Sequence, residues 1–257
     1  MNDETEGPDS TIEPDDRDTN QIVVSEAPDK QTTEAVQLGE VLHRMGEAYR
    51  RDPVQAVRGQ TFISLLHEYV ATQLESRLTT FAIRRGIKVR LEPLILGSTK
   101  PKNVDVAVVD PDNGPLILIG LRSQMSSIGK NVLTYYEGIV GECVSLQERF
   151  PMAVHGYAYL HPYRSIMPGH EEVSIDHLRY ARMYAAVTGR PGPGYKGLRG
   201  VFDEFAYMVV DFGRNPPDVM DEHIKTAVPE PDMSIHTFVN RLITRFKSRL
   251  VFWDVFD

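Results

Sequence analysis

Hydrophobic residues recur three or four positions apart in five stretches of the chain, which is the spacing of an amphipathic helix. The stretches are residues 35–50, 53–83, 130–149, 171–188 and 238–250. The second is opened by Pro53 and ends near Gly86, as expected for residues that start and stop helices. The pattern therefore predicts five helices.

Shorter segments with strand character lie between these helices. Residues 87–96 begin with alternation and high β-propensity, and Pro93 predicts an edge or a bend within them. Residues 102–124 hold two apolar runs around a tight turn, and 152–160 and 205–212 have the composition of further strands. From residue 53 to residue 160 the predicted order is helix, three strands, helix, strand.

The turn in residues 102–124 sets the register of a predicted hairpin. Pro, Asp, Asn and Gly at 111–114 are typical of a four-residue loop. Counting outward from that loop places Asp110 opposite Pro115, Asp105 opposite Gly120, and Asn103 opposite Arg122. Because side chains alternate along a strand, Asp105, Gly120 and Arg122 are then expected on one face of the sheet.

This hairpin resembles the PD-(D/E)xK nuclease superfamily, which includes most type II restriction enzymes. In that superfamily an Asp on one strand is followed on the next by Asp or Glu, any residue, and Lys. Asp105 matches the first acid, Gly120 departs from the second, and Arg122 replaces the lysine. The segment 122–131, RSQMSSIGKN, also resembles bacterial restriction endonuclease homologues.

The resemblance implies an α/β (α+β) fold with a restriction-endonuclease-like αβββαβ core. Such a core is a central mixed sheet flanked by helices, here followed by additional C-terminal helices and a strand. It also implies Mg²⁺ as cofactor, double-stranded DNA as substrate and, by analogy with enzymes that cut symmetric sites, a homodimer. In this chemistry carboxylates hold the ion while a cation offsets phosphate charge.

Residue types suggest how the motif positions act. Asp105 is the first metal ligand, and Arg122 stabilises phosphate but stays protonated and cannot serve as a base. Gln124 is a candidate catalytic residue for binding a phosphate or the attacking water, or else a polar loop residue. The alternative interpretation is that Asp105 is a strand-end or turn carboxylate and Arg122 a solvated cation.

The helix at 130–149 offers a replacement for the missing acid. Some restriction enzymes of the superfamily carry their second acid displaced onto this helix. Glu137 falls in an apolar row with Leu133 and Val140, so it is the first candidate for a catalytic and metal-binding carboxylate. Glu142 is the second choice and Glu68 the third; the alternative for Glu137 is a helix edge that reaches solvent.

Charge divides the chain into two parts. Its net charge is −8, but residues 1–37 hold eleven acids against two bases, a net of −9, so the remainder sums to +1. This leader has few large apolar residues and is expected to be disordered. Residues 38–257 are expected to form one nuclease-like domain, with a core at about 53–160 and an extension at 161–257 for recognition or dimerisation.

No segment predicts a membrane span, a signal peptide or a disulfide. No run approaches the about 18 apolar residues of a membrane helix, and the acidic start lacks the features of a signal peptide. The single cysteine, Cys143, lies on an apolar helical row and is expected to serve packing. A cytoplasmic protein is the expectation.

Several polar residues are candidates for contacts to DNA. They are Lys130 and Asn131 at the start of the 130–149 helix, and Arg190, Lys196 and Arg199 in the Gly-rich segment 189–200. Helix capping is the alternative for Asn131. A GxGxxG match within that segment follows a helical pattern rather than a strand, so no nucleotide cofactor is expected. The basic residues around the 238–250 helix are expected to be solvated, and the histidines, His67 among them, to be structural or surface residues.

Two functions remain open from the sequence. The first is a sequence-specific double-stranded DNA endonuclease that resembles type II restriction enzymes. The second keeps the fold but has lost metal hydrolysis, which leaves a DNA-binding or partner-binding protein. Gly120 and Arg122 favour the second, whereas Asp105 and the available glutamate favour the first.

Overall fold

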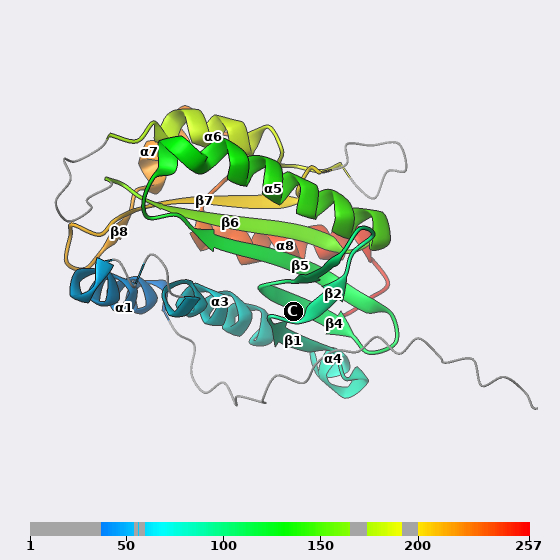
Figure 1. Cartoon of the computed structure of the whole chain (residues 1–257). Coiled ribbons are helices and arrows are strands. Elements are labelled where there is room, and N and C mark those ends of the chain that lie inside the picture. The colour runs from blue at the N-terminus through cyan, green and yellow to red at the C-terminus, as the bar shows by residue number, and fades with distance from the viewer. Residues whose placement is uncertain (1–36, 54–55, 57–59, 165–173, 192–199) are drawn as a thin grey trace, which may run out of the picture.

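A computed structural model describes residues 37–53, 56, 60–164, 174–191 and 200–257. The acidic leader, apart from Gln37, lies outside these residues. The chain forms a mixed α/β structure built on a six-stranded sheet of order β1-β4-β5-β6-β7-β8 (Figure 1). The strands are β1 (Lys88–Leu91), β4 (Val106–Asp110), β5 (Gly114–Ser123), β6 (Val154–Pro162), β7 (Glu204–Asp211) and β8 (Asp218–Val219). A separate two-stranded hairpin is formed by β2 (Leu94–Leu96) and β3 (Pro101–Asn103).

Helices cover both faces of the large sheet. They are α1 (Leu38–Arg51), α3 (Gln60–Glu75), α4 (Thr80–Arg85), α5 (Ile128–Arg149), α6 (His177–Ala185), α7 (Asp221–Ala227) and α8 (Ile235–Arg249). In Figure 1, α5 and α6 lie on one side of the sheet, while α1, α3 and α8 lie on the other. No helix in the described part of the chain has the length and apolar character needed to cross a bilayer.

Each face of the sheet has its own hydrophobic core. Apolar residues of α1, α3 and α8 pack with Val106, Ile119, Leu160 and other side chains of the near face. The far face packs under α5, α6 and α7 and is mainly aromatic. The strand residues alternate between these two cores, as the period-two pattern requires. The sheet is therefore buried on both sides.

The direction of pairing changes across the sheet. β1 pairs antiparallel with β4, and β4 pairs antiparallel with β5. β5, β6 and β7 are parallel, and β8 returns antiparallel at the far edge. The parallel β5–α5–β6 crossover places α5 over the face that carries Asp105 and Gly120.

The predicted helix at 53–83 is two helices, because tertiary contacts interrupt it. α3 ends at Glu75 and α4 begins at Thr80. Between them, the Thr79 N–H donates to the Val255 carbonyl, and the Thr79 hydroxyl donates to the Asp254 carbonyl. The same hydroxyl caps α4 by accepting from the Ala82 N–H, so the C-terminal segment fixes the break.

The predicted hairpin register is correct near Asp105 and wrong at the turn. Val106 lies opposite Ile119, which places Asp105 at the position opposite Gly120. Asp110, however, pairs with Gly114 rather than Pro115, because the register shifts between Val108 and Val109. The loop is therefore 111–113.

The first strand of the hairpin is also divided. Asn103 was expected opposite Arg122, but it pairs with Leu94 in the β2–β3 hairpin. The backbone turns away from the sheet at Val104, whose N–H donates to the Pro93 carbonyl. The bend predicted at Pro93 therefore separates the sheet strand β1 from this small hairpin.

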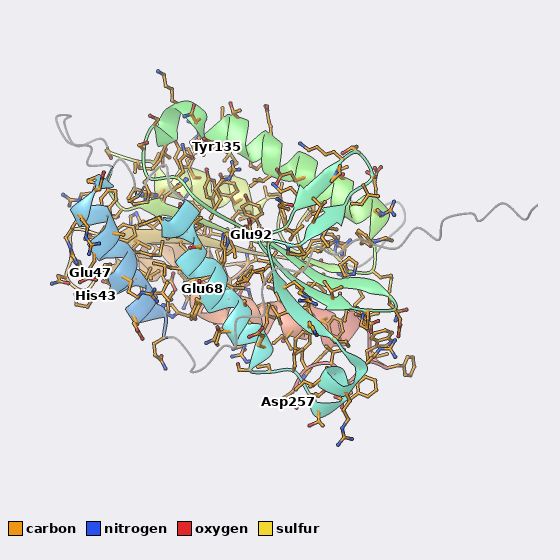
Figure 2. All side chains as sticks on the ribbon, turned by 60° about the horizontal axis from the view of Figure 1, so that its bottom comes forward. His43, Glu47, Glu68, Glu92, Tyr135 and Asp257 are labelled. Carbon is orange, nitrogen blue, oxygen red and sulfur yellow. The ribbon has the colours of Figure 1, made fainter. Side chains whose placement is uncertain are left out.

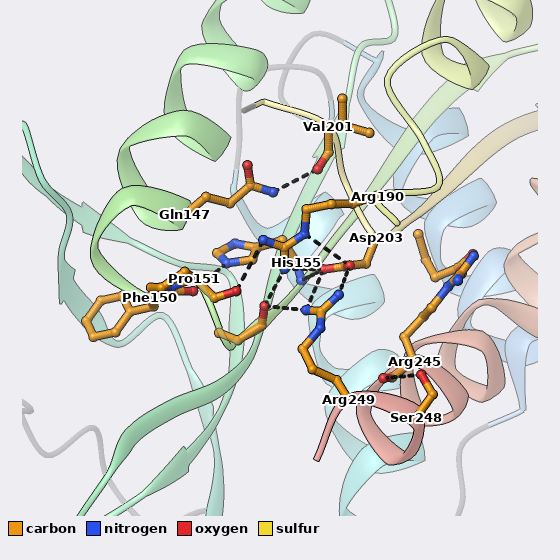
Figure 3. A network of polar contacts seen from close by, with 12 residues as sticks. Gln147, Phe150, Pro151, His155, Arg190, Val201, Asp203, Arg245, Ser248 and Arg249 are labelled. Carbon is orange, nitrogen blue, oxygen red and sulfur yellow. Dashed lines mark hydrogen bonds and ion pairs between the residues drawn. The ribbon is translucent and has the colours of Figure 1, made fainter. Parts of the chain in front are cut away.

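A buried ion network connects the C-terminal elements to the start of β6 (Figure 3). Asp203 is fully buried and accepts hydrogen bonds from Arg190, Arg249 and the His155 N–H. Arg190 also donates to the carbonyls of Pro151 and Ala153. Burial alone would raise the pKa of Asp203, but the two arginines outweigh it and hold the pKa below its usual range.

The expectation of a solvated basic cluster around the last helix is therefore wrong in part. Arg249 is buried against Asp203, and Arg241 and Arg245 both pair with the buried Glu204. These guanidinium groups join α8 to the beginning of β7. Removing either acid would leave buried guanidinium charge without a counter-charge, which is costly.

We expect Asp203→Asn to lower the free energy of unfolding by about 3–5 kcal/mol, because two buried guanidinium groups would lose their counter-charge. Urea unfolding near neutral pH measures this. Asp112→Asn is the matched control, since Asp112 pairs with Arg85 but is 72% exposed, and should change stability by less than about 1 kcal/mol. Equal effects of the two substitutions would contradict the assignment.

Candidate functional site

Asp105 is held by backbone groups on two sides. Its Oδ2 accepts a hydrogen bond of 2.6 Å from the Leu121 N–H of β5. Its own carbonyl accepts from the Glu92 N–H at 3.1 Å. Asp105 immediately precedes β4, so these bonds fix its carboxylate beside the middle of the sheet.

A small cavity of about 30 Å³ lies next to this carboxylate. Asp105, Lys102, Gly120, Glu142 and Tyr157 are among its lining residues. The Lys102 Nζ lies 2.8 Å from Glu142 Oε1. The side chains of Asp105, Lys102 and Glu142 are 29%, 32% and 26% exposed. An aspartate, a glutamate and a lysine therefore meet where solvent still reaches them.

Burial dominates the electrostatics of Asp105. Desolvation raises the pKa of Asp105 to about 6, and Glu142 adds to the rise. The Leu121 N–H, Lys102 and Arg122 act in the opposite direction but do not outweigh it. The charged carboxylate is thus incompletely compensated by the protein, and perturbed pKa values of this kind cluster at functional sites.

Gly120 has no room for the acid that the family motif places there. A Cβ built on Gly120 would lie 2.4 Å from the ring of Tyr157. Tyr157 is the partner of Gly120 in the neighbouring strand β6, and its ring stacks on Phe205 at 5.5 Å. The aromatic layer thus occupies the position of the expected second carboxylate.

Arg122 follows on the same strand and stacks on an aromatic ring. Its guanidinium carbon lies 4.7 Å from the centre of the Tyr135 ring on α5. Burial would lower the pKa of Arg122, but Tyr157, Tyr159 and Glu142 outweigh it, so the group stays protonated. Arg122 is therefore a fixed cation near the site, and it contributes to the field at Asp105.

The structure places Glu137, the first candidate for the displaced acid, on the exposed side of α5. The buried stripe of α5 runs through Val132, Ile139 and Cys143. Glu137 is two residues before Ile139 and therefore points about 160° away from it around the helix. Glu142 flanks the stripe and reaches the cavity instead.

The third candidate, Glu68, lies on α3 and is half-buried (Figure 2). It affects His67 electrostatically but does not line the cavity. Of the three glutamates, only Glu142 joins Asp105 there. An acid supplied by the 130–149 helix was expected. Glu142 has the position for that role, and Glu137 does not line the cavity.

Gln124 is committed to structural hydrogen bonds. It is buried, and its carbonyl accepts from the Tyr159 hydroxyl at 2.6 Å. Its amide nitrogen donates to the carbonyls of Ser126 and Ser127 at the start of α5. These contacts orient the β5–α5 connection and leave Gln124 away from the lining of the cavity.

The candidates for DNA contacts fall in different environments. Lys130 is exposed and Asn131 half-buried in the first turn of α5, whose N-cap residue, Ser127, makes no side-chain capping bond. Arg190 was expected in a basic loop, but it is buried against Asp203, so that expectation is wrong. Lys196 and Arg199 lie outside the described residues.

Sequence reasoning missed three residues around Asp105. Lys102 lies three positions before it, a spacing that would place it on the same strand if the strand were unbroken. His67 from α3 and Glu92 from the bend after β1 approach Asp105 from the other side. Only the folded chain brings these distant segments together.

The donor set is compatible with Mg²⁺ but not with a site made entirely by protein. Within the described ranges, no group of three or more acidic, histidine or cysteine side chains is placed to hold a metal ion. Mg²⁺ is commonly bound through one or two carboxylates, with waters and substrate phosphate completing its shell. Asp105 and Glu142 are two such carboxylates, and Asp105 lacks full compensation of its charge.

We expect Asp105→Asn to stabilise the protein at alkaline pH. Because the folded-state pKa is raised, the folded state binds more protons than the unfolded state between about pH 4 and pH 6, and stability from this group falls as pH rises through that window. The asparagine variant should gain up to about 2 kcal/mol near pH 8 and nothing near pH 4. Urea unfolding at both pH values measures the difference. A variant less stable than wild type near pH 8 would contradict the uncompensated charge.

An acid introduced at Gly120 should destabilise the fold. Gly120→Asp is expected to cost at least about 2 kcal/mol, because the new side chain meets the Tyr157 ring. The cost should shrink when Tyr157 is replaced by Ala. Gly138→Asp is the control, since a Cβ at Gly138 meets nothing within 4 Å. Chemical denaturation measures all variants, and an equal cost of Gly120→Asp with and without Tyr157 would contradict the steric explanation.

Comparisons of the chain with models of protein families, with curated proteins and with solved structures find no match.

Proposed function

We propose that the chain is a Mg²⁺-dependent double-stranded DNA endonuclease with a restriction-endonuclease-like core. The observation that carries this proposal is the meeting of Asp105, Glu142 and Lys102 at one cavity beside the β4–β5 hairpin. An acid, a second acid and a lysine are the three side-chain types of the PD-(D/E)xK motif that the hairpin resembles. Here Asp105 lies at the start of β4, Glu142 lies on α5 and Lys102 lies on β3.

The order of elements supports the same proposal. α3, β1, β4, β5, α5 and β6 follow one another as helix, three strands, helix, strand, apart from the short α4 and the β2–β3 hairpin. The four strands are neighbours in the sheet, with two antiparallel pairings and then a parallel one. α3 and α5 lie on opposite faces (Figure 1). This order and pairing support the proposal of an αβββαβ core.

Each residue has a distinct role in the proposed reaction. Asp105 and Glu142 would hold Mg²⁺, which when bound lowers the pKa of water and offsets phosphate charge. Lys102 donates to an incoming phosphate or to water, since its ammonium group is compact and already lies at the cavity. Arg122 adds a fixed positive charge behind the site. Because the three cavity residues are partly exposed, a backbone phosphate can reach them.

Cleavage of both strands of a duplex favours two copies of the site. A symmetric DNA site is matched by a two-fold symmetric protein, so a homodimer is part of the proposal. β7, β8 and the helices after β6 then supply surfaces for recognition or for contact between the copies.

A second function is favoured by one specific observation. Glu142 already has a partner in Lys102, and Gly120 is covered by Tyr157, so the site resembles one in which ion pairing has replaced metal binding. A nuclease-like fold that binds DNA or a protein without cutting fits that geometry. Activity measurements separate the two functions.

We expect the purified chain to cut mixed plasmid DNA into discrete fragments with Mg²⁺. Asp105→Ala and Glu142→Gln should each lower the rate at least about a hundredfold, because each removes a carboxylate from the cavity. Gel analysis of fragments over time measures the rates. Intact DNA with every divalent metal, together with retained DNA binding, would overturn the enzyme and favour the second function.

Glu137→Gln is the matched control for Glu142→Gln. Both residues lie on α5, but Glu137 is exposed away from the cavity, so its replacement should leave the rate within about twofold of wild type. A strong effect at Glu137 with none at Glu142 would reassign the second acid to Glu137.

A further inference from the structure

His67 approaches Asp105 from the side of the sheet opposite to Glu142. It lies on α3, and its side chain is 6% exposed. The His67 Nε2 is 4.0 Å from Asp105 Oδ1, and its Nδ1 is 3.8 Å from Glu92 Oε1. The imidazole therefore lies between two carboxylates, one partly buried and one 51% exposed.

The Nε2 of His67 is a buried polar atom that makes no hydrogen bond of ordinary geometry among the described residues, although the Leu121 backbone lies close enough to the ring to raise the pKa of His67. Buried donors and acceptors are nearly always paired, because an unpaired one loses its bond to water without replacement. The carboxylate oxygen that faces this nitrogen is Asp105 Oδ1, at 4.0 Å. A shift of about 1 Å would turn this approach into a hydrogen bond of ordinary length.

Glu92 ties the same group to the backbone around Asp105. Its φ of 51° lies in the left-handed region, which is uncommon for a residue other than glycine. In this conformation its N–H donates to the Asp105 carbonyl while its side chain faces His67. Figure 2 labels Glu92, whose side chain faces His67 in the middle of α3. Uncommon backbone conformations of this kind cluster at functional sites.

We infer that His67 is a positioning residue that holds Asp105 Oδ1 through its Nε2–H, while the Leu121 N–H holds Oδ2. The two bonds fix the plane of the carboxylate and leave its remaining lone pairs facing the cavity. This inference rests on the proposed function, because it assigns Asp105 a ligand's role there. Partners of this kind behind a metal-binding group typically change metal affinity or activity 10- to 100-fold.

The surroundings of His67 suit this role, because its side chain is 6% exposed and its two ring nitrogens face two different carboxylates. Glu92 is well exposed and can be hydrated, whereas Asp105 is the more desolvated acid. Placing an N–H on Nε2 therefore satisfies the group with the greater need.

The test compares His67→Gln with His67→Met in the full chain. Glutamine keeps an N–H donor near the position of Nε2, whereas methionine has a similar length, fills the buried space and has no donor. Both retain a residue that forms helices well, so folding is expected in each. His43→Gln is the control, because His43 pairs with Glu47 on the surface of α1 (Figure 2) and does not line the cavity beside Asp105.

Two readouts separate this inference from the proposed function. The first is Mn²⁺ binding followed by electron paramagnetic resonance, and the second is the Mg²⁺ concentration that gives half-maximal DNA cleavage. His67→Met should raise the Mn²⁺ dissociation constant and the Mg²⁺ requirement about tenfold, with KM for DNA unchanged. His67→Gln and His43→Gln should stay within about threefold of wild type.

Each outcome has one meaning. Wild-type activity and metal affinity in His67→Met would overturn the positioning role and leave the proposed endonuclease intact. Mn²⁺ binding that weakens in His67→Met but not in His67→Gln, in a chain that cuts no DNA, would support the positioning role and overturn the endonuclease. A wild-type chain that binds no Mn²⁺ would overturn both.

Discussion

The hydrogen bond from the Leu121 N–H to Asp105 is the contact on which the candidate site depends. Leu121 is held in the middle of the sheet by its parallel pairing with Ala158, so the bond fixes the carboxylate to a rigid element. The bond alone does not repay the burial of the charge, which is why the pKa of Asp105 is raised to about 6. A carboxylate held rigidly and compensated incompletely is preorganised for an added cation. The free-energy cost of desolvating the Asp105 carboxylate is offset by the packing of the rest of the fold.

Aromatic packing decides which acid can join Asp105. Tyr157 on β6 packs with Phe205 and covers Gly120, so β5 cannot present a carboxylate at the expected place. Glu142 from α5 and Lys102 from the β2–β3 hairpin line the cavity instead. The candidate site is therefore not contained in one hairpin. Its residues come from three places: Lys102 from β3, Asp105 from the start of β4 and Glu142 from α5. Such a set depends on the placement of α5, which Gln124 and the Tyr159 hydroxyl stabilise at its first turn.

Sequence periodicity predicted the order of the main elements, because each helix and strand buries one regular set of apolar side chains. It also predicted the position of Asp105 opposite Gly120, since alternation is robust over short distances. It did not predict the division of the strand at Val104 or the burial of Arg190, which depend on partners far along the chain. The exposure of Glu137 has a similar cause: Leu133 and Val140 define an apolar row, but Leu133 is 54% exposed and this row is not the buried one. His67 and Glu92 carry no local signal, because only tertiary structure brings them to Asp105.

Two buried or partly buried aspartates show why burial alone does not mark a functional site. Asp203 is fully buried, yet two guanidinium groups and a backbone N–H lower its pKa, so its charge is satisfied within the protein. Asp105 is less buried but has a single short hydrogen bond from the backbone and more distant cations, and its pKa rises. The first charge is balanced by its partners when the chain folds. The charge of Asp105 is incompletely compensated, and its side chain is still 29% exposed to solvent. A bound cation would compensate this charge. Asp105 is therefore the better candidate for a functional residue because its charge is incompletely compensated, and not because it is deeply buried.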